Sequence, residues 1–400
     1  EIRPILTETA TLPFAKSEVE PYSADAFHND LMRVTEGLAD SNLSQFLVEN
    51  SLPTVSWMAS MGVTWELHAN HAAQRNGKFI WRSGTIPVEA RGGGRGLVDM
   101  LFASVERRKI PVFYLTRAVG LLTDQSGAVC GVMAHTAEGK KEFHCKALVL
   151  ACGGFEADPE MRARYLGAGW DLVKVRGTRF NTGDGIRMAL EAGATPYGHW
   201  SGCHASVIDS ESPDLEAAAT EVSRYSYPYC VMVNREGDRF VDEGEDLQVY
   251  TYAKTGRRIL EQPGSIGYQI FDKKTLPLLR SAYQNARPLV AQSIEELADG
   301  LAIESEKLKP NLEAFNRAVQ SGEFDSSRRD GKATRGIKPP KSNWALPIDT
   351  PPFYAYGVNC GITFTYGGCR IDEQGRVRTA EDRFIPGLWA AGELTGGFFY

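Results

Sequence analysis

The sequence of 400 residues has no apolar run near the roughly 20 residues that a membrane-spanning helix needs. It also has no CxxC pair, although it contains seven cysteines. Scattered cysteines in odd number argue against a disulfide framework and against a zinc site, and free thiols are typical of the reducing cytoplasm. We therefore expect a cytoplasmic protein without a bound metal.

A surplus of basic residues is lacking as well. The chain has 44 lysines and arginines against 50 aspartates and glutamates, which gives a net charge of −6. This balance does not favour binding to nucleic acid. With 42% hydrophobic and 24% charged residues, the composition is typical of a soluble globular protein, and the length predicts two or three domains.

Hydrophobic periodicity predicts a chain of mixed helices and strands. Residues 97–108 have the spacing of a helix, and the apolar residues 111–115 predict a strand directly after it. Alternating polarity between residues 118 and 144 predicts an antiparallel meander. The apolar run 147–151 ends in a Gly-Gly pair, which is typical of a buried parallel strand followed by a tight turn.

Three glycine-containing segments stand out: Ala147–Glu156 (ALVLACGGFE), Asn181–Gly185 (NTGDG) and Ile385–Gly397 (IPGLWAAGELTGG). Glycine after a strand allows a backbone to approach a flat or anionic ligand closely, because no Cβ intervenes. Backbone amides at a helix start bind anions, and Asp184 can accept hydrogen bonds from hydroxyl groups. Each segment alone is also typical of a plain turn, but their order and spacing together are more specific.

Together with Arg91–Gly96 (RGGGRG) and the meander, these motifs make the sequence resemble the flavoprotein family of fumarate reductases and succinate dehydrogenases. The resemblance implies an α/β fold with an incomplete, Rossmann-like FAD-binding domain of the glutathione-reductase type and an inserted α+β capping domain. It assigns residues 1–199 to the first part of the FAD-binding domain, 200–359 to the capping domain and 360–400 to the second part of the FAD-binding domain.

The same resemblance implies FAD as the cofactor and suggests its contacts. The strand at Ala118 and Val119 resembles the one whose backbone holds the adenine. Asp184 resembles the aspartate that contacts FAD, and Glu393, which follows Gly392, resembles the glutamate near the ribityl chain or the ribose. The strand end that lies against the dinucleotide corresponds to Ala151, Cys152, Gly153 and Gly154.

One family motif is missing from these 400 residues. The GxGxxG fingerprint, which cradles the pyrophosphate of a dinucleotide, occurs nowhere in the sequence. We therefore expect that the first β–α–β unit and the segment that follows Tyr400 in the family are absent, and that residues 1–400 bind FAD weakly or not at all. An alternative is a structural module without a cofactor.

The predicted capping domain begins with a candidate substrate histidine. The segment Tyr197–His204 (YGHWSGCH) lies where the family carries a histidine that binds a substrate carboxylate, and His204 matches better than His199. The alternative is an ordinary interface histidine. Further along, Asn234–Glu243 (NREGDRFVDE) matches a family segment that we expect to be a structural hairpin.

Two departures distinguish this chain from fumarate reductases. Leu247 stands where they have a proton-donating arginine, and Gly361–Gly368 (GITFTYGG) has no histidine where they have one. Fumarate reduction is therefore not favoured. Ketosteroid dehydrogenases of the family use tyrosines for proton transfer, so Tyr250 and Tyr252 are candidates for that role. The alternative is that both are core or interface aromatics.

Other stretches, among them VKVRGTRFNTGDG, resemble the tricarballylate dehydrogenases of the family. Such a reaction needs a base for the α-proton, a flavin to take the hydride and cations for the carboxylates. Arg176, Arg179, Arg224 and His204 are the candidate cations, since arginine can bind a carboxylate with two hydrogen bonds. Of these, Arg179 and His204 are predicted to be catalytic.

We therefore predict dehydrogenation of a C–C bond next to a carboxylate, with a small-molecule, tricarballylate-like substrate. Ketosteroid dehydrogenase-like and fumarate reductase-like activities are the alternatives. The electron acceptor implied by the family is a membrane protein or an iron–sulfur protein.

Overall fold

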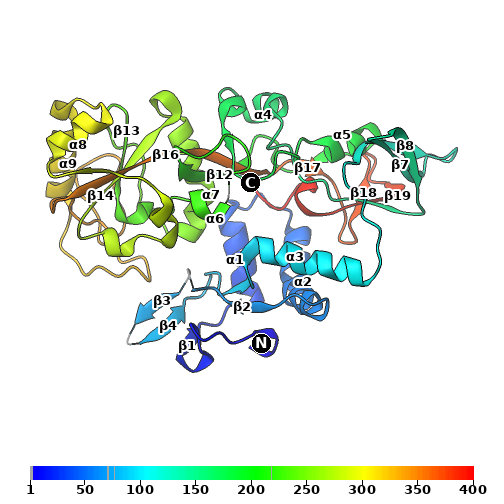
Figure 1. The fold of residues 1–400 in the computed structure, drawn as a ribbon, viewed down its shortest axis with the longest axis horizontal. Helices are drawn as coiled ribbons and strands as arrows, with labels where there is room; N and C mark the ends of the chain where they lie inside the picture. Colours follow the sequence, from blue (N-terminus) through cyan, green and yellow to red (C-terminus); the bar gives the residue numbers. More distant parts are fainter. Residues whose placement is uncertain (1–2, 70–71, 76, 218) are drawn as a thin grey trace. The chain divides into compact units, whose positions relative to one another are not determined.

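A computed structural model describes residues 3–69, 72–75, 77–217 and 219–400 (Figure 1). The chain divides into two compact units, each assembled from separate stretches. Unit 1 holds the chain up to Ala151, Gly185–His199 and Gly368–Tyr400, whereas unit 2 holds Cys152–Asp184 and Trp200–Gly367. The predicted boundary after residue 199 coincides with a boundary between the units, whereas unit 2 ends at Gly367 rather than 359 and also includes residues 152–184, which the prediction left with the first part of the chain.

Unit 1 combines helices with small sheets. Helix α1 begins after Ser23, whose side chain accepts a hydrogen bond from the Ala26 amide, and α2 begins after Asp40, which accepts from the Asn42 and Leu43 amides. The helices are α1 (Ala24–Val34), α2 (Ser41–Ser60), α3 (Gly93–Arg107) and α5 (Asp184–Glu191, whose first residue belongs to unit 2); the strands are β1 (Ser17–Val19), β2 (Trp65–Leu67), β3 (Ala73–Arg75), β4 (Lys78–Trp81), β5 (Val88–Ala90), β6 (Arg117–Thr123), β7 (Val129–Thr136), β8 (Gly139–His144), β9 (Leu148–Leu150), β11 (Pro196–Tyr197), β17 (Gly368–Cys369), β18 (Arg376–Arg378) and β19 (Phe384–Ala390).

The predicted meander is confirmed, but the predicted strand at 111–115 is wrong. Strands β6, β7 and β8 pair antiparallel in sequence order. Residues 111–115 instead form an irregular stretch whose large side chains are exposed, and Leu115 reaches 90% exposure. Five apolar residues therefore did not suffice, because a strand also needs a neighbour to complete its hydrogen bonds.

Strand β9 is parallel to β19, as expected for the run 147–151. The register pairs Leu148 with Leu388 and Leu150 with Ala390, and the sheet order is β18-β19-β9. The expectation that this strand is buried was wrong in part, since Val149 is 62% exposed. Successive side chains of a strand project onto opposite faces of the sheet, and the face onto which Val149 projects is largely uncovered within the described part of the chain.

Unit 2 is built around one long strand, β16, in a six-stranded sheet (Figure 1). β16 pairs antiparallel with β12, β14 and β15 and parallel with β10, and β13 follows β14. The strands are β10 (Lys174–Val175), β12 (Cys203–Asp209), β13 (Val231–Asn234), β14 (Gly267–Asp272), β15 (Leu289–Ala291) and β16 (Phe353–Thr365); the helices are α4 (Pro159–Leu166), α6 (Ala219–Val222), α7 (Gln248–Leu260), α8 (Ile294–Leu301) and α9 (Ser305–Ala318).

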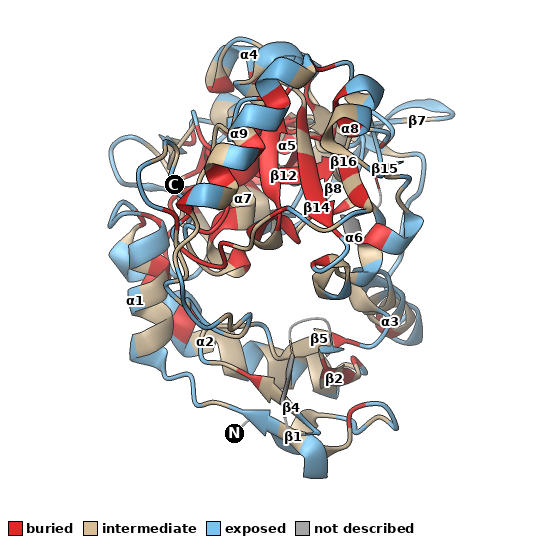
Figure 2. Ribbon diagram, turned by 90° about the vertical axis from the view of Figure 1, so that its left-hand side faces the viewer, coloured by how far each residue is buried: buried red, intermediate tan, exposed pale blue. Residues whose placement is uncertain are grey.

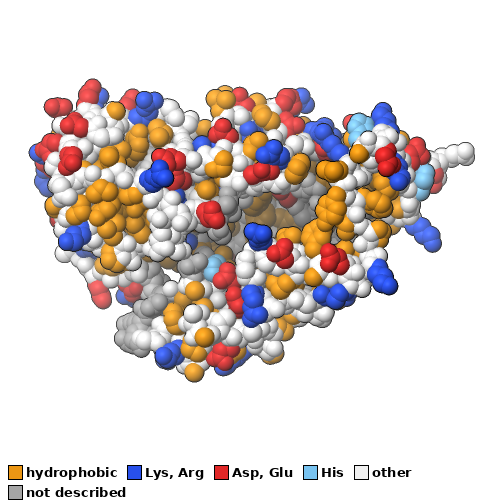
Figure 3. Space-filling view, in the orientation of Figure 1, with side chains coloured by type: hydrophobic (Ala, Val, Ile, Leu, Met, Phe, Trp, Pro, Cys, Tyr) orange, Lys and Arg blue, Asp and Glu red, His pale blue; other side chains and the backbone are white. Residues whose placement is uncertain are grey.

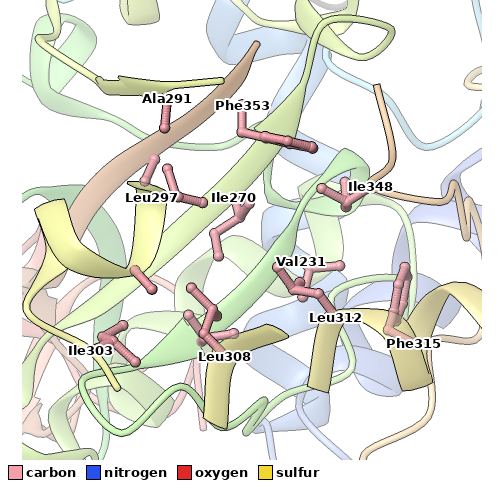
Figure 4. Close-up of a cluster of buried hydrophobic side chains, with 13 residues drawn as sticks. Val231, Ile270, Ala291, Leu297, Ile303, Leu308, Leu312, Phe315, Ile348 and Phe353 are labelled. Atoms are coloured by element: carbon pink, nitrogen blue, oxygen red, sulfur yellow. The ribbon is translucent and has the colours of Figure 1, made fainter. Parts of the chain in front are cut away.

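Both faces of this sheet carry a hydrophobic core, and its strands are largely buried (Figure 2). Alternate residues along a strand point to opposite faces. On β13, Val231 packs with α8 and α9 in the cluster that Figure 4 shows, while Met232 packs in a second cluster that includes Ile259 of α7. The helices α8 and α9 therefore cover one face of the sheet and α7 covers the other.

The Asn234–Glu243 segment forms the expected hairpin and adds a buried ion pair. The Asn234 side chain accepts hydrogen bonds from the Glu236 and Asp238 amides. The Arg239 guanidinium lies 2.5 Å from the Glu243 carboxylate, and both side chains are almost fully buried. We conclude that the matching residues of this motif stabilise the capping region.

The surface contains charges of both signs. Acidic and basic side chains are interspersed on the face drawn in Figure 3, in keeping with the net charge of −6. Among the described residues, no helix has the length and apolar character that would let it span a membrane.

Candidate functional site

Strand pairing brings together three of the predicted cofactor residues in unit 1. β9 and β19 run parallel, so the residues that follow them, Ala151 and Gly392-Glu393, leave the sheet at the same edge. The amide of Ala391 donates to the carbonyl of Leu150 over 2.9 Å, which fixes the two ends side by side. Ligands of parallel α/β sheets bind at this carboxyl edge.

The backbone at this edge can be approached from outside. Ala151 and Gly392 are exposed, and Gly392 has a φ of +73°, with no atom within 4 Å of where a Cβ would stand. These features fit a flat, phosphorylated cofactor lying close to the main chain. Ala118 and Val119 also belong to unit 1, on the outer strand β6 of the meander.

The other predicted cofactor residues lie together in unit 2. The amide of Gly183 donates to the carbonyl of Gly154 over 2.9 Å, which joins the segment Cys152–Gly154 to the start of α5 at Asp184. Gly153 has a φ of +74°, and a Cβ there would stand 2.6 Å from the side chain of Asn181. Glycine is therefore required at this position both by the backbone angle and by the space.

A second group of predicted residues gathers around His204 on β12. His204 and Ser206 lie two residues apart on one strand and therefore share a face. The pairing of β12 with β16 shifts between His204, which faces Phe364, and Ala205, which faces Ile362, so Thr363 is an extra residue on β16. Such a β-bulge re-aims the side chains beside it, and bulges are frequent next to active sites.

Helix α7 brings Tyr252 onto His204. A Cβ on Gly256 would stand 2.5 Å from the carbonyl oxygens of Ala205 and Ser206, so this glycine allows the helix to lie directly against β12. Tyr252 is one helical turn before Gly256 on the same face. Its ring meets the imidazole of His204 edge-on, at 4.9 Å between centroids and 68° between planes.

Hydroxyl groups and one arginine complete this group. The Tyr225 hydroxyl donates to Ser206 Oγ over 3.0 Å, and Ser206 Oγ lies 3.2 Å from His204 Nδ1. Arg176 donates from Nη1 to Thr363 Oγ1 over 3.0 Å, and its guanidinium carbon lies 5.7 Å from the centre of the Tyr225 ring. We call His204, Ser206, Tyr225, Tyr252, Arg176 and Thr363 the His204 cluster.

The cluster keeps its histidine neutral. Burial, and next to it the positive charge of Arg176, lower the pKa of His204 to about 3. Burial likewise raises the pKa of the Tyr252 hydroxyl, and the neighbouring Tyr225 adds to that rise. Near pH 7 the cluster therefore contains a neutral imidazole and a protonated Tyr252 phenol beside the guanidinium of Arg176.

Three predicted residues do not share these contacts. Arg179 forms two hydrogen bonds to the Glu216 carboxylate, at 2.7 and 2.8 Å, with both side chains about half exposed. Arg224 is buried in an ion pair with Asp209. Tyr250 is two residues before Tyr252 on α7, about 200° around the helix, and so faces another direction.

The sequence interpretation missed Ser206 and Tyr225. Ser206 could have been found from its spacing, because it follows His204 by two residues in a strand-like stretch. Tyr225 is 19 positions from Ser206, and nothing in its local sequence indicates the hydrogen bond between them. Thr363 lies in Gly361–Gly368, the segment noted above only for lacking a family histidine.

Comparison with known proteins identifies relatives over nearly the whole chain. Residues 11–399 match the FAD binding domain family. A probable fumarate reductase of Shewanella frigidimarina is 28% identical over 93% of this chain and 59% of its own length. A 3-oxosteroid 1-dehydrogenase of Mycobacterium tuberculosis is 26% identical over 76% of this chain and 58% of its own length. The chain thus spans about three fifths of the length of each of these two relatives.

The fold also has solved counterparts. The open conformation of a flavocytochrome c3 fumarate reductase superposes with a TM-score of 0.71 and 24% identity, over 94% of this chain and 63% of that one. The predicted α/β FAD-binding fold with a capping domain is thereby confirmed, and FAD is the cofactor that the family match indicates.

Proposed function

The chain belongs to the flavoprotein family of fumarate reductases and succinate dehydrogenases, and we propose that it oxidises or reduces a carbon–carbon bond next to a carboxylate. The observation that carries this proposal is the His204 cluster, in which an arginine, a neutral histidine and two tyrosine rings are in contact. When bound, FAD supplies the hydride acceptor or donor.

For the cofactor, the two backbone groups described above take the binding role. Ala151, Gly392 and Glu393 in unit 1, with Ala118 and Val119 on β6, offer main-chain groups and one carboxylate. Cys152, Gly153 and Gly154 offer close-lying backbone in unit 2. Asp184 at the first turn of α5 accepts hydrogen bonds from cofactor hydroxyls, since carboxylates are strong acceptors.

For the substrate, the charge of Arg176 favours an anion. Arg176 is half-buried, and its Nη1–Thr363 hydrogen bond holds it beside the Tyr225 ring. A carboxylate near such a fixed guanidinium gains a charge-assisted hydrogen bond. His204 binds a second oxygen as a neutral group, and Tyr252 is the proton carrier. A tricarballylate-like tricarboxylate is the specific substrate that we propose, and succinate or fumarate are simpler members of the same class.

A ketosteroid-type reaction is the second candidate. Tyr225 and Tyr252 lie with their ring centroids 5.2 Å apart, and paired tyrosines suit proton transfer at carbon next to a ketone. The similarity to a 3-oxosteroid 1-dehydrogenase supports this candidate as well. The positive charge of Arg176 favours the carboxylate candidate instead, because a carboxylate gains a charge-assisted hydrogen bond from a guanidinium and a ketone gains a weaker one.

We also propose a cellular location and an electron acceptor for the protein. Seven free cysteines support a reducing compartment such as the cytoplasm. A membrane-bound or iron–sulfur protein is the proposed redox partner.

The test is a panel of compounds mixed with the FAD-loaded protein while the flavin absorbance is followed. Tricarballylate and succinate are expected to bleach the oxidised flavin, and a 3-ketosteroid to leave it unchanged. Fumarate would restore the colour of the reduced flavin under the fumarate reductase-like alternative. Bleaching by the ketosteroid alone would replace the first candidate by the second. No response to any of the four compounds would reject both.

Arginine variants sharpen this test. Arg176→Gln should abolish the response to carboxylates, because it removes the positive charge that binds them. Glutamine is chosen since it keeps a hydrogen-bonding side chain, so the loss of charge is tested by itself. Arg179→Gln is the matched variant, since Arg179 must leave its ion pair with Glu216 before it can bind substrate. If the flavin response to carboxylates falls more in Arg179→Gln than in Arg176→Gln, Arg179 rather than Arg176 binds the substrate.

A further inference from the structure

Hydrogen bonds around Ser206 connect Arg176, Thr363, Tyr225 and His204 in one series. Arg176 has only donors, so its Nη1 hydrogen must be accepted by Thr363 Oγ1 over 3.0 Å. The Tyr225 hydroxyl donates to Ser206 Oγ over 3.0 Å. Ser206 is fully buried, and its Oγ lies 3.4 Å from Thr363 Oγ1 and 3.2 Å from His204 Nδ1.

Two directions satisfy the donors and lone pairs of the remaining bonds: Ser206 donates to His204 Nδ1, or it accepts from Nδ1 and donates to Thr363 Oγ1. A hydroxyl group has one hydrogen and two lone pairs. Thr363 uses one lone pair for Arg176 and has its own hydrogen to give to Ser206. If Ser206 accepts from both Thr363 and Tyr225, its two lone pairs are filled. Its single hydrogen then has one acceptor within reach, the Nδ1 atom of His204.

We infer that Ser206 and Tyr225 are positioning residues that hold His204 in the tautomer with its proton on Nε2, so that the imidazole meets a substrate oxygen as a neutral hydrogen-bond donor. A neutral imidazole has one donor and one acceptor nitrogen, and the partner of one nitrogen decides the state of the other. With Nδ1 accepting from Ser206, Nε2 must carry the hydrogen.

This inference rests on the proposed function and assigns different tasks to His204 and Arg176. An Nε2–H group suits an oxygen with a free lone pair, as in a carboxylate or ketone conjugated with the reacting carbon–carbon bond. Since the donor is uncharged, the positive charge that binds an anion comes from Arg176 alone. His204 instead stabilises the negative charge that develops on the oxygen during the reaction.

The tautomer can be measured without cofactor or substrate. In the 15N-labelled chain, the ring nitrogens of His204 are assigned as the signals that His204→Gln removes. We expect a protonated Nε2 and an unprotonated Nδ1 in the unmodified chain. In Ser206→Ala, and to a lesser degree in Tyr225→Phe, the signals should shift towards a mixture of both tautomers. Tyr227→Phe is the control, because its hydroxyl bonds to Thr251 and takes no part in the series.

Two results would overturn the inference. One is a proton on Nδ1 of His204 in the unmodified chain. The other is an Nε2–H ring that responds to neither Ser206→Ala nor Tyr225→Phe; the second variant retains its aromatic ring and so keeps the test valid if Ser206→Ala folds poorly.

Steady-state kinetics of the FAD-loaded protein provide a second test of the positioning role. With the compound of the panel that reacts, Ser206→Ala should lower kcat about tenfold with little change in KM, because the donor acts mainly on the developing charge. An equal kcat would contradict the positioning role. If no compound reacts, the proposed function fails, yet the tautomer measurement still decides the state of His204.

Discussion

At the scale of single residues, the burial of His204 ties stability to pH. Its pKa falls from an ordinary 6.5 to about 3 in the folded chain, first through burial and then through Arg176. Between these values the unfolded chain binds a proton that the folded chain excludes, so stability is lost as pH falls below about 6.5. At pH 5.5 the loss from this residue amounts to roughly 1.4 kcal/mol.

Urea unfolding at pH 7.5 and 5.5 checks this expectation. The midpoint of unit 2 should fall with pH more steeply in the unmodified chain than in His204→Gln. His135→Gln is the control, since His135 is exposed on β7. Equal pH dependence of all three proteins would show that His204 becomes protonated without penalty.

Single residues also mark the limit of the sequence interpretation. His204 could be singled out because a family motif and a strand pattern agree on it. Arg176 was only one of several candidate cations, since its role depends on Thr363, 187 positions away. A pair at that separation has no local signature, so the chemistry of each partner is visible in the sequence but their contact is not.

At the scale of elements, the close packing of α7 on β12 depends on Gly256. Gly256→Ala would bring a methyl group 2.5 Å from two backbone carbonyls, which cannot move without shifting the strand. We expect a loss of about 1–3 kcal/mol in the free energy of unfolding, as for other overpacked sites, even though alanine is the better helix former. Displacement of Tyr252 from His204 should follow.

Thermal unfolding of Gly256→Ala measures the first effect. Gly94→Ala in α3 is the matched control, because a Cβ there meets no atom within 4 Å. That variant should gain up to about 1 kcal/mol from helix propensity. A gain of similar size in Gly256→Ala would mean that α7 does not rest on β12.

The elements themselves were predictable where the signal is local. Period-two alternation and short turns define β6, β7 and β8, so the meander could be read directly. Residues 111–115 have the same composition as a strand but no described pairing partner. The bulge at Thr363 was equally invisible, since it arises from the register between two strands rather than from either one.

At the scale of the whole molecule, FAD should stabilise the fold through binding. A ligand that binds only the folded state at 100 times its Kd adds about 2.7 kcal/mol. Because the sequence lacks the GxGxxG fingerprint and weak binding is expected, FAD is supplied in this large excess over its Kd. We then expect FAD to raise the unfolding temperature of the chain and Asp184→Ala to reduce this rise while leaving the temperature without FAD nearly unchanged. Asp299→Ala, at an exposed position of α8, is the control.

If FAD raises the unfolding temperature of Asp184→Ala as much as that of the unmodified chain, Asp184 does not contact the cofactor. An equal drop in stability with and without FAD would give Asp184 a role in folding instead. The grouping of segments into units could not be predicted from the sequence. Each unit is assembled from distant stretches of the chain, and residues 152–184 belong to unit 2 although the prediction placed them with the first part of the FAD-binding domain. Such long-range grouping has no counterpart in composition or periodicity.

The margin of the β18-β19-β9 sheet also bears on handling the protein. β9 has a single described strand neighbour, and Val149 on it is 62% exposed. A short apolar strand of this kind can recruit another copy of itself by backbone pairing. Self-association through this strand would then limit the concentration at which a preparation of these 400 residues stays in solution.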